Sequence, residues 1–105
     1  MRTVQFRNQL DQESALGVRF ELESGQVQKF TVQLEYLIGG QWAPVVRYDT
    51  AHGFAHMDIM HPYDSAQKVP VETRDNNEAL TLAVEDLTNN RTKYRRRYLQ
   101  WLQNR

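Results

Sequence analysis

All three histidines of the chain lie in the stretch VRYDTAHGFAHMDIMH, which spans residues 46–61. Imidazole exchanges protons near neutral pH, a carboxylate can orient the imidazole ring, and a guanidinium group stabilises developing negative charge. Cleavage of RNA without a metal ion needs these roles: a base for the 2′-hydroxyl, an acid for the leaving oxygen and a cation for the phosphorane. The stretch therefore supplies five candidate catalytic residues: Arg47, Asp49, His52, His56 and Asp58.

The same stretch has two competing interpretations. His52, His56 and Asp58 could ligate a divalent ion, although a loop histidine and a strand histidine are not a recognised ligand spacing. The histidines could also be ordinary hydrogen-bonded residues of the core or the surface. We assign His61 a structural role, because a regular strand would place it on the other face, beside Met57 and Ile59.

The candidate residues must be positioned by an antiparallel sheet, since apolar and polar residues alternate along most of the first 72 residues. Gly39 and Gly40 can adopt the positive φ of a tight hairpin turn, which would separate two of the strands. The predicted sheet has four or five strands, drawn from the ranges 3–7, 17–24, 29–38, 41–49 and 55–61.

After residue 72 the spacing of the apolar residues changes from two to between three and four. This spacing predicts one long helix over residues 75–103. Asp75 stands three positions before Glu78, which resembles a capping box at the start of a helix. One apolar stripe follows at intervals of seven, and it would pack on the sheet: Leu80, Leu87, Tyr94 and Trp101. Asn89 and Asn90 could interrupt the helix. The expected fold is a single α+β domain over residues 1–105.

The last two predicted strands pair best in a register that places Asp49 opposite His56. This register also places Arg47 opposite Asp58, so that polar residues face polar residues. Which face of the sheet carries these polar residues depends on the preceding hairpin. A two-residue turn pairs Leu34 with Val45 and partly buries the polar groups, which we favour, whereas a three-residue turn with a bulge sends them to solvent.

Basic residues gather at the end of the chain, although the formal net charge is zero. Residues 1–90 contain 7 Lys or Arg and 13 Asp or Glu, whereas residues 91–105 contain 6 Lys or Arg and no acid. The tail could contact RNA or an acidic partner, or it could bind the acidic body of its own chain. The candidates for nucleic-acid contact are Arg91, Lys93, Arg95 and Arg96.

The chain has no cysteine, which excludes disulfides, zinc sites with thiolate ligands and cysteine nucleophiles. No apolar run approaches the length of a transmembrane helix, and the amino terminus lacks the apolar core of a signal peptide. We therefore expect a cytoplasmic protein that does not contact a membrane. No residue pattern calls for a cofactor.

The run WAPVVRYDTAHGFAHMDIMHP resembles the core of a small uncharacterised bacterial family, the domain of unknown function DUF7718. This resemblance covers most of residues 28–72. The pattern of five positions within the run is more loosely similar to that of TumE-type toxins of toxin–antitoxin pairs: Tyr48, Asp49, Gly53, His56 and Asp58. The second resemblance implies RNA or another translation component as the target and a helix-turn-helix antitoxin as the partner.

Two functions follow from these observations. The first is a toxin-like protein of a bacterial two-gene system that cleaves RNA through the histidine-containing stretch. The second is a non-enzymatic interaction module, in which the acidic sheet and basic helix serve assembly as a homodimer or with a partner chain.

Overall fold

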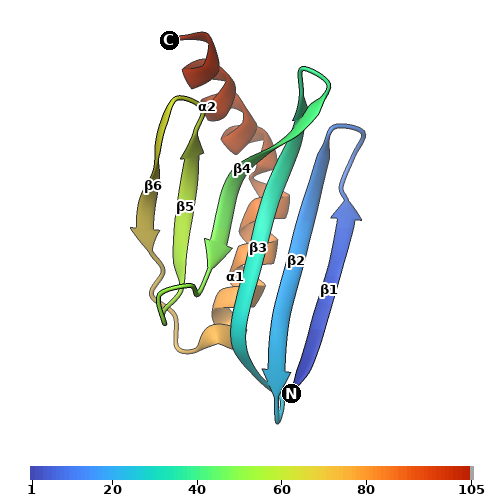
Figure 1. Cartoon of the computed structure of the whole chain (residues 1–105), viewed down its shortest axis with the longest axis vertical. Coiled ribbons are helices and arrows are strands. Elements are labelled where there is room, and N and C mark those ends of the chain that lie inside the picture. The colour runs from blue at the N-terminus through green and yellow to red at the C-terminus, as the bar shows by residue number, and fades with distance from the viewer. Residues whose placement is uncertain (105) are drawn as a thin grey trace.

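The protein is an antiparallel sheet followed by two helices, as seen in a computed structural model that describes residues 1–104. Each strand pairs with the strands before and after it in the chain, giving the order β1-β2-β3-β4-β5-β6 (Figure 1). The elements are β1 Arg2–Gln9, β2 Ser14–Glu23, β3 Gln26–Ile38, β4 Gln41–Asp49, β5 His56–His61, β6 Asp64–Pro70, α1 Asn76–Asn89 and α2 Arg91–Gln103.

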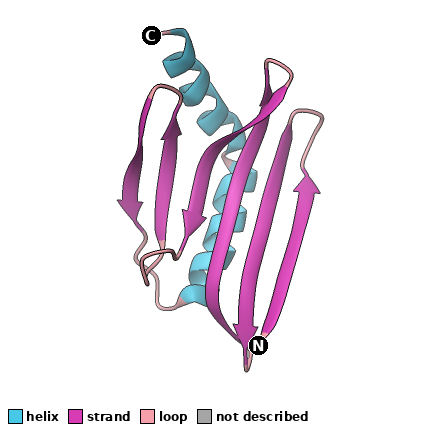
Figure 2. Ribbon diagram, viewed as in Figure 1, coloured by secondary structure: helices cyan, strands magenta, loops and turns pink. Residues whose placement is uncertain are grey.

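Both helices lie on one face of the sheet (Figure 2). Helix α1 packs mainly on β3, and α2 packs on β4 and β5. The core lies between these two layers and contains the alternate apolar residues of the strands together with small and apolar residues of α1: Leu16, Val18, Phe30, Val32, Leu34, Tyr36, Val46, Tyr48, Ala79, Ala83 and Leu87. We call the other face of the sheet, which no helix covers, the open face.

The predicted α+β fold with an antiparallel sheet is confirmed, but the element count was wrong in two places. The sheet has a sixth strand, β6, where the sequence shows no alternation of apolar and polar residues. The long helix is two helices, because Asn90 ends α1 and begins α2. Asp75 is the N-cap of α1, as predicted, and its side chain accepts a hydrogen bond from the backbone N–H of Glu78 at 2.9 Å. Neither helix within residues 1–104 has the length and apolarity needed to cross a membrane.

The predicted pairing of β4 with β5 is confirmed at every predicted position, including Asp49 opposite His56 and Arg47 opposite Asp58. The pairing of β3 with β4 differs from the prediction. The turn has two residues, since Ile38 pairs with Gln41, but an irregularity between Leu34 and Glu35 shifts the register. Leu34 therefore pairs with Val46 rather than with Val45. The irregularity leaves Val45 of β4 without a partner in β3. This extra residue places the polar groups of β4 and β5 on the open face.

Two tyrosines and one aspartate join the helices to the sheet. Asp86 of α1 accepts hydrogen bonds at one carboxylate oxygen from Tyr48 of β4 at 2.6 Å and from Tyr94 of α2 at 2.7 Å. Burial, together with the hydrogen bond to Asp86 and its negative charge, raises the pKa of both phenols well above the usual value of 10.0. Both hydroxyls therefore remain protonated donors and connect three elements at one point.

Candidate functional site

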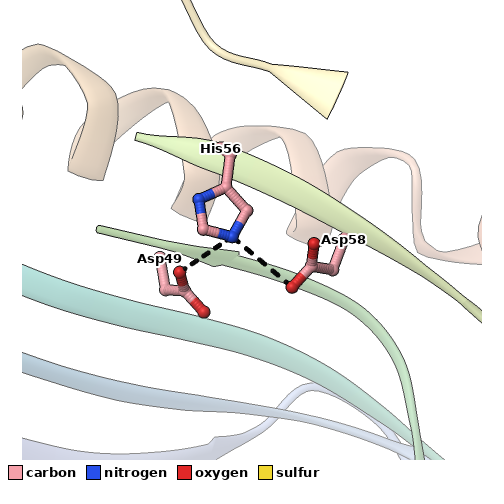
Figure 3. A group of neighbouring side chains, drawn as sticks. All are labelled: Asp49, His56 and Asp58. Atoms are coloured by element: carbon pink, nitrogen blue, oxygen red, sulfur yellow. Dashed lines mark ion pairs between the residues drawn. The ribbon is translucent and has the colours of Figure 1, made fainter. Parts of the chain in front are cut away.

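His56 lies between two carboxylates on the open face of the sheet (Figure 3). Its Nε2 atom is 3.1 Å from Oδ1 of Asp49 and 3.5 Å from Oδ2 of Asp58. These three residues, which we call the His56 cluster, come from two paired strands: Asp49 ends β4, while His56 and Asp58 alternate on β5. The cross-strand register predicted from the sequence is what brings them together.

The His56 cluster is buried although no helix covers this face. The side chains of His56 and Asp58 are 6 % and 9 % exposed, and that of Asp49 is 13 % exposed. The cover comes from the loop between β4 and β5 and from β6. The ring of His52 stacks on that of His56 with centroids 5.5 Å apart, and Phe54 contacts it edge-on at 6.4 Å.

A small pocket of about 270 Å³ adjoins the imidazole of His56, between the loop and strand β6. It is lined by His52, Phe54, His56, Lys68 and Pro70. The walls are an aromatic ring, a proline and two imidazoles, with one lysine at the side. A flat aromatic group such as a nucleobase fits walls of this kind, because aromatic side chains stack on bases.

The two nitrogens of His56 have opposite surroundings. Nε2 faces two carboxylates, which accept hydrogen bonds only, so the proton of a neutral ring belongs on Nε2. Nδ1 is buried and has no hydrogen-bond partner within residues 1–104. This is the arrangement by which an aspartate orients a catalytic histidine: one nitrogen is fixed as a donor and the other keeps a free lone pair that can accept a proton.

Lys68 is the cation of the site, and nothing in the sequence apart from its charge indicates this role. It pairs with Asp58 in the register of β5 with β6, and its Nζ atom is 3.2 Å from Oδ1 of that aspartate. Its side chain is 62 % exposed, which leaves the ammonium group accessible beside the pocket. Its place beside Asp58 depends on β6, whose sequence lacks the alternation that predicts a strand.

Arg47, the predicted cation, points away from the pocket. Its Nε and Nη2 atoms donate to Oε1 of Gln33 on β3 at 2.9 and 2.6 Å. It lines a second hollow of about 590 Å³ on the open face, over Gly17 of β2. Because Gly17 has no side chain, Arg7 of β1 reaches across β2 and donates to Glu35 of β3 at 3.2 Å. Arg47 therefore lies outside the pocket beside His56, unlike the predicted catalytic residue His52.

The chemistry of the His56 cluster also fits a divalent cation. One nitrogen and two carboxylate oxygens lie within 4.8 Å of one another, and zinc accepts such ligands. This set differs from the alternative considered in the sequence, since Asp49 takes the place of His52. Two features oppose the cation: Lys68 already holds one oxygen of Asp58, and Nδ1 of His56 lacks the second partner that a metal-bound histidine usually has.

The four residues of α2 predicted to contact nucleic acid fall into two groups. Arg91 is 3.0 Å from Asp11 and Arg95 is 3.4 Å from Glu13, so both pair with the loop between β1 and β2. Burial acts to raise the pKa of Asp11, but hydrogen bonds from Ser14, from the backbone and from Arg91 outweigh burial and lower this pKa to about 2. Lys93 and Arg96 are exposed. Contact of this helix with a nucleic acid stays a prediction, for which Lys93 and Arg96 are the accessible candidates.

His61 lies on the opposite face from His56, as predicted; this is the helix-covered face, where its ring stacks on that of Trp101 of α2 with centroids 4.6 Å apart. It is therefore separated from the His56 cluster by the sheet itself.

Comparison with curated proteins and with solved structures gave no match to this chain. The similarity to TumE-type toxins therefore has no support from them. A family model described as a domain of unknown function (DUF7718) matches residues 1–104, well beyond the central run that resembled this family in the sequence. The chain belongs to the DUF7718 family.

Proposed function

We propose that this protein cleaves RNA at the pocket beside His56, without a metal ion. The observation that carries the proposal is the unpartnered Nδ1 of a buried histidine whose other nitrogen faces two carboxylates. A buried polar atom without a partner costs free energy. Arg95 and Arg97 also have one, so Nδ1 of His56 is distinguished by the two carboxylates at Nε2 and by the pocket that its ring lines.

The reaction assigns a role to each group at the pocket. Nδ1 of His56 is buried in the free chain, so RNA must first displace the side chains that cover it. Nδ1 then takes the proton of a ribose 2′-hydroxyl, and the resulting oxygen attacks the adjacent phosphorus. The bond from phosphorus to the 5′-oxygen breaks, and the exposed His52 gives its proton to that leaving oxygen. Lys68 balances the negative charge of the phosphorane. The products are a 2′,3′-cyclic phosphate and a free 5′-hydroxyl.

The carboxylates act through His56 rather than on the substrate. Asp49 and Asp58 hold the ring with Nε2 protonated and stabilise the imidazolium that forms when Nδ1 accepts a proton. We name them positioning residues, while His56, His52 and Lys68 are the groups that would touch RNA.

The proposal is tested with the purified chain and a labelled RNA oligonucleotide in the presence of EDTA. We expect cleavage to a cyclic phosphate, and a loss of about 10²-fold or more in His56→Gln, the usual contribution of a general base. His61→Gln is the matched control, because it removes a histidine from the opposite face. Circular dichroism establishes that both variants fold. Full cleavage by folded His56→Gln, or no cleavage by the parent chain, would overturn the proposal.

The setting in a toxin–antitoxin pair is a further part of this proposal. If it holds, expression of the chain alone arrests growth, whereas His56→Gln does not, and co-expression of the neighbouring gene relieves the arrest. Growth that is unaffected by the parent chain would remove the toxin setting while leaving RNA cleavage to be judged by the biochemical assay.

A non-enzymatic interaction module is the second candidate function. One specific observation favours it, which is an edge of the sheet that is left open to another strand.

A further inference from the structure

Strand β1 forms one edge of the sheet, and no other element within residues 1–104 lies along its outer side (Figure 1). It pairs with β2 without interruption from Arg2 to Gln9. Half of the backbone N–H and C=O groups of an edge strand point outward, so a straight strand of this length can template the addition of another strand.

The two edges of the sheet differ in the features that discourage such pairing. Proteins protect edge strands with lysine, proline and bulges. Strand β6 has all three, since it contains Lys68 and Pro70 and its pairing with β5 is irregular between Ile59 and His61. Strand β1 has the sequence RTVQFRNQ, which contains no lysine or proline, and its register shows no bulge. Apart from the charges of Arg2 and Arg7, the β1 edge carries none of these protections.

The helix side of β1 is apolar and uncovered. Val4 and Phe6 pair with Phe20 and Val18, and so share the face on which the helices lie. However, α1 packs mainly on β3, and α2 packs mainly on β4 and β5. Phe6 is therefore 49 % exposed, which is unusual for an aromatic side chain on the core face of a sheet.

We propose that β1 pairs antiparallel with β1 of a second copy, so that the two sheets join into one. With Gln5 opposite Gln5, Val4 of each copy faces Phe6 of the other, and the exposed apolar side chains cover one another. Arg7 then faces Thr3, and Arg2 faces Asn8, so that no like charges are opposed. A second copy is the occupant that this strand specifies, because its own sequence is complementary to itself under a twofold axis.

The oligomeric state of the full chain tests this interface. Sedimentation of the parent chain across a range of concentrations is expected to show a dimer. Phe6→Lys places a charge on each side of the twofold axis and is expected to weaken the dimer by about a hundredfold or more. Leu82→Lys is the matched control, because Leu82 is 41 % exposed but lies on α1, away from the edge, and this variant should remain dimeric.

A cross-linking experiment tests the register and does not depend on the folding of Phe6→Lys. The chain has no cysteine, so Gln5→Cys introduces a single thiol per copy. In the proposed register these two thiols are directly opposed and form a disulfide-linked dimer under mild oxidation. Gln67→Cys, on the β6 edge, is the control that should not cross-link.

Each of three results would overturn the proposal: a parent chain that sediments as a monomer throughout, a dimer unaffected by Phe6→Lys, or cross-linking of Gln67→Cys as readily as Gln5→Cys. The dimer and RNA cleavage are independent, since neither test uses a residue of the other site.

Discussion

The hydroxyl of Tyr48 lies 2.6 Å from Oδ2 of Asp86, so that one short hydrogen bond joins the carboxyl-terminal end of strand β4 to helix α1. Because Tyr94 of α2 donates to the same oxygen, a single carboxylate connects both helices to the sheet.

Asp86→Ala should therefore destabilise the fold strongly. It leaves the hydroxyls of two buried tyrosines without their acceptor, at roughly 1–3 kcal/mol each, for a total of roughly 2–6 kcal/mol. Urea denaturation measures the change in the free energy of unfolding. Glu85→Ala is the control, because this neighbour on the same helix is exposed and should change stability by less than about 0.5 kcal/mol. A similar small effect for Asp86→Ala would mean that the tyrosine contacts do not hold the helices.

The same contacts predict a loss of stability in alkali. The pKa of Tyr48 and of Tyr94 is raised in the folded chain, chiefly by burial, while in the unfolded chain each phenol ionises near pH 10.0. Above that pH the unfolded state binds fewer protons than the folded state. Stability is therefore fully present below pH 10.0 and falls as the pH rises further.

Urea midpoints measured from about pH 9 to about pH 11 would test this dependence. Tyr48→Phe removes one of the two titrating groups, so its stability should fall less steeply with pH than that of the parent chain. Parallel curves for the two proteins would show that the alkaline loss has another origin.

Lys68→Gln separates the proposed catalytic role from stability. The ion pair with Asp58 is largely exposed on the lysine side, so its removal should lower stability by less than about 1 kcal/mol. RNA cleavage should fall by roughly tenfold to a thousandfold, because the phosphorane loses its nearest cation. Lys29→Gln is the matched control, since Lys29 is exposed on β3 outside the pocket. Equal cleavage by both variants would remove Lys68 from the proposed site.

The part of the site that could be predicted from the sequence is the pairing of β4 with β5. Charged and apolar residues sort cleanly in only one register, and the structure has that register. A shift of one residue would have mixed them, which is why this local prediction was reliable.

The face of the sheet on which the polar residues lie could not be predicted, because it depends on one extra residue in β4. The run Pro44-Val45-Val46 contains two adjacent valines, and either could pair with Leu34. Only the contacts of the complete core decide between them. The predicted choice between a buried and a solvated site was also too simple, since the polar groups lie on the open face and are buried by His52, Phe54 and strand β6.

The break between the helices depends on contacts far from it in the sequence. Asn90 is compatible with a continuous helix, but Asp86 and Tyr94 are eight positions apart, about 12 Å along a straight helix. The change of direction at Asn90 allows the two side chains to meet at 2.7 Å. An apolar stripe at intervals of seven carries no information about this contact.

The order of the strands bears on how the chain acquires its shape. Since every strand lies beside its neighbours in the sequence, successive hairpins can form without closing a long loop, and acquisition of the sheet should be fast. Both helices follow the strands in the sequence, so during synthesis the hydrophobic side of the nascent sheet is completed before its cover exists. Chaperones that recognise exposed apolar strands would bind the sheet in that interval.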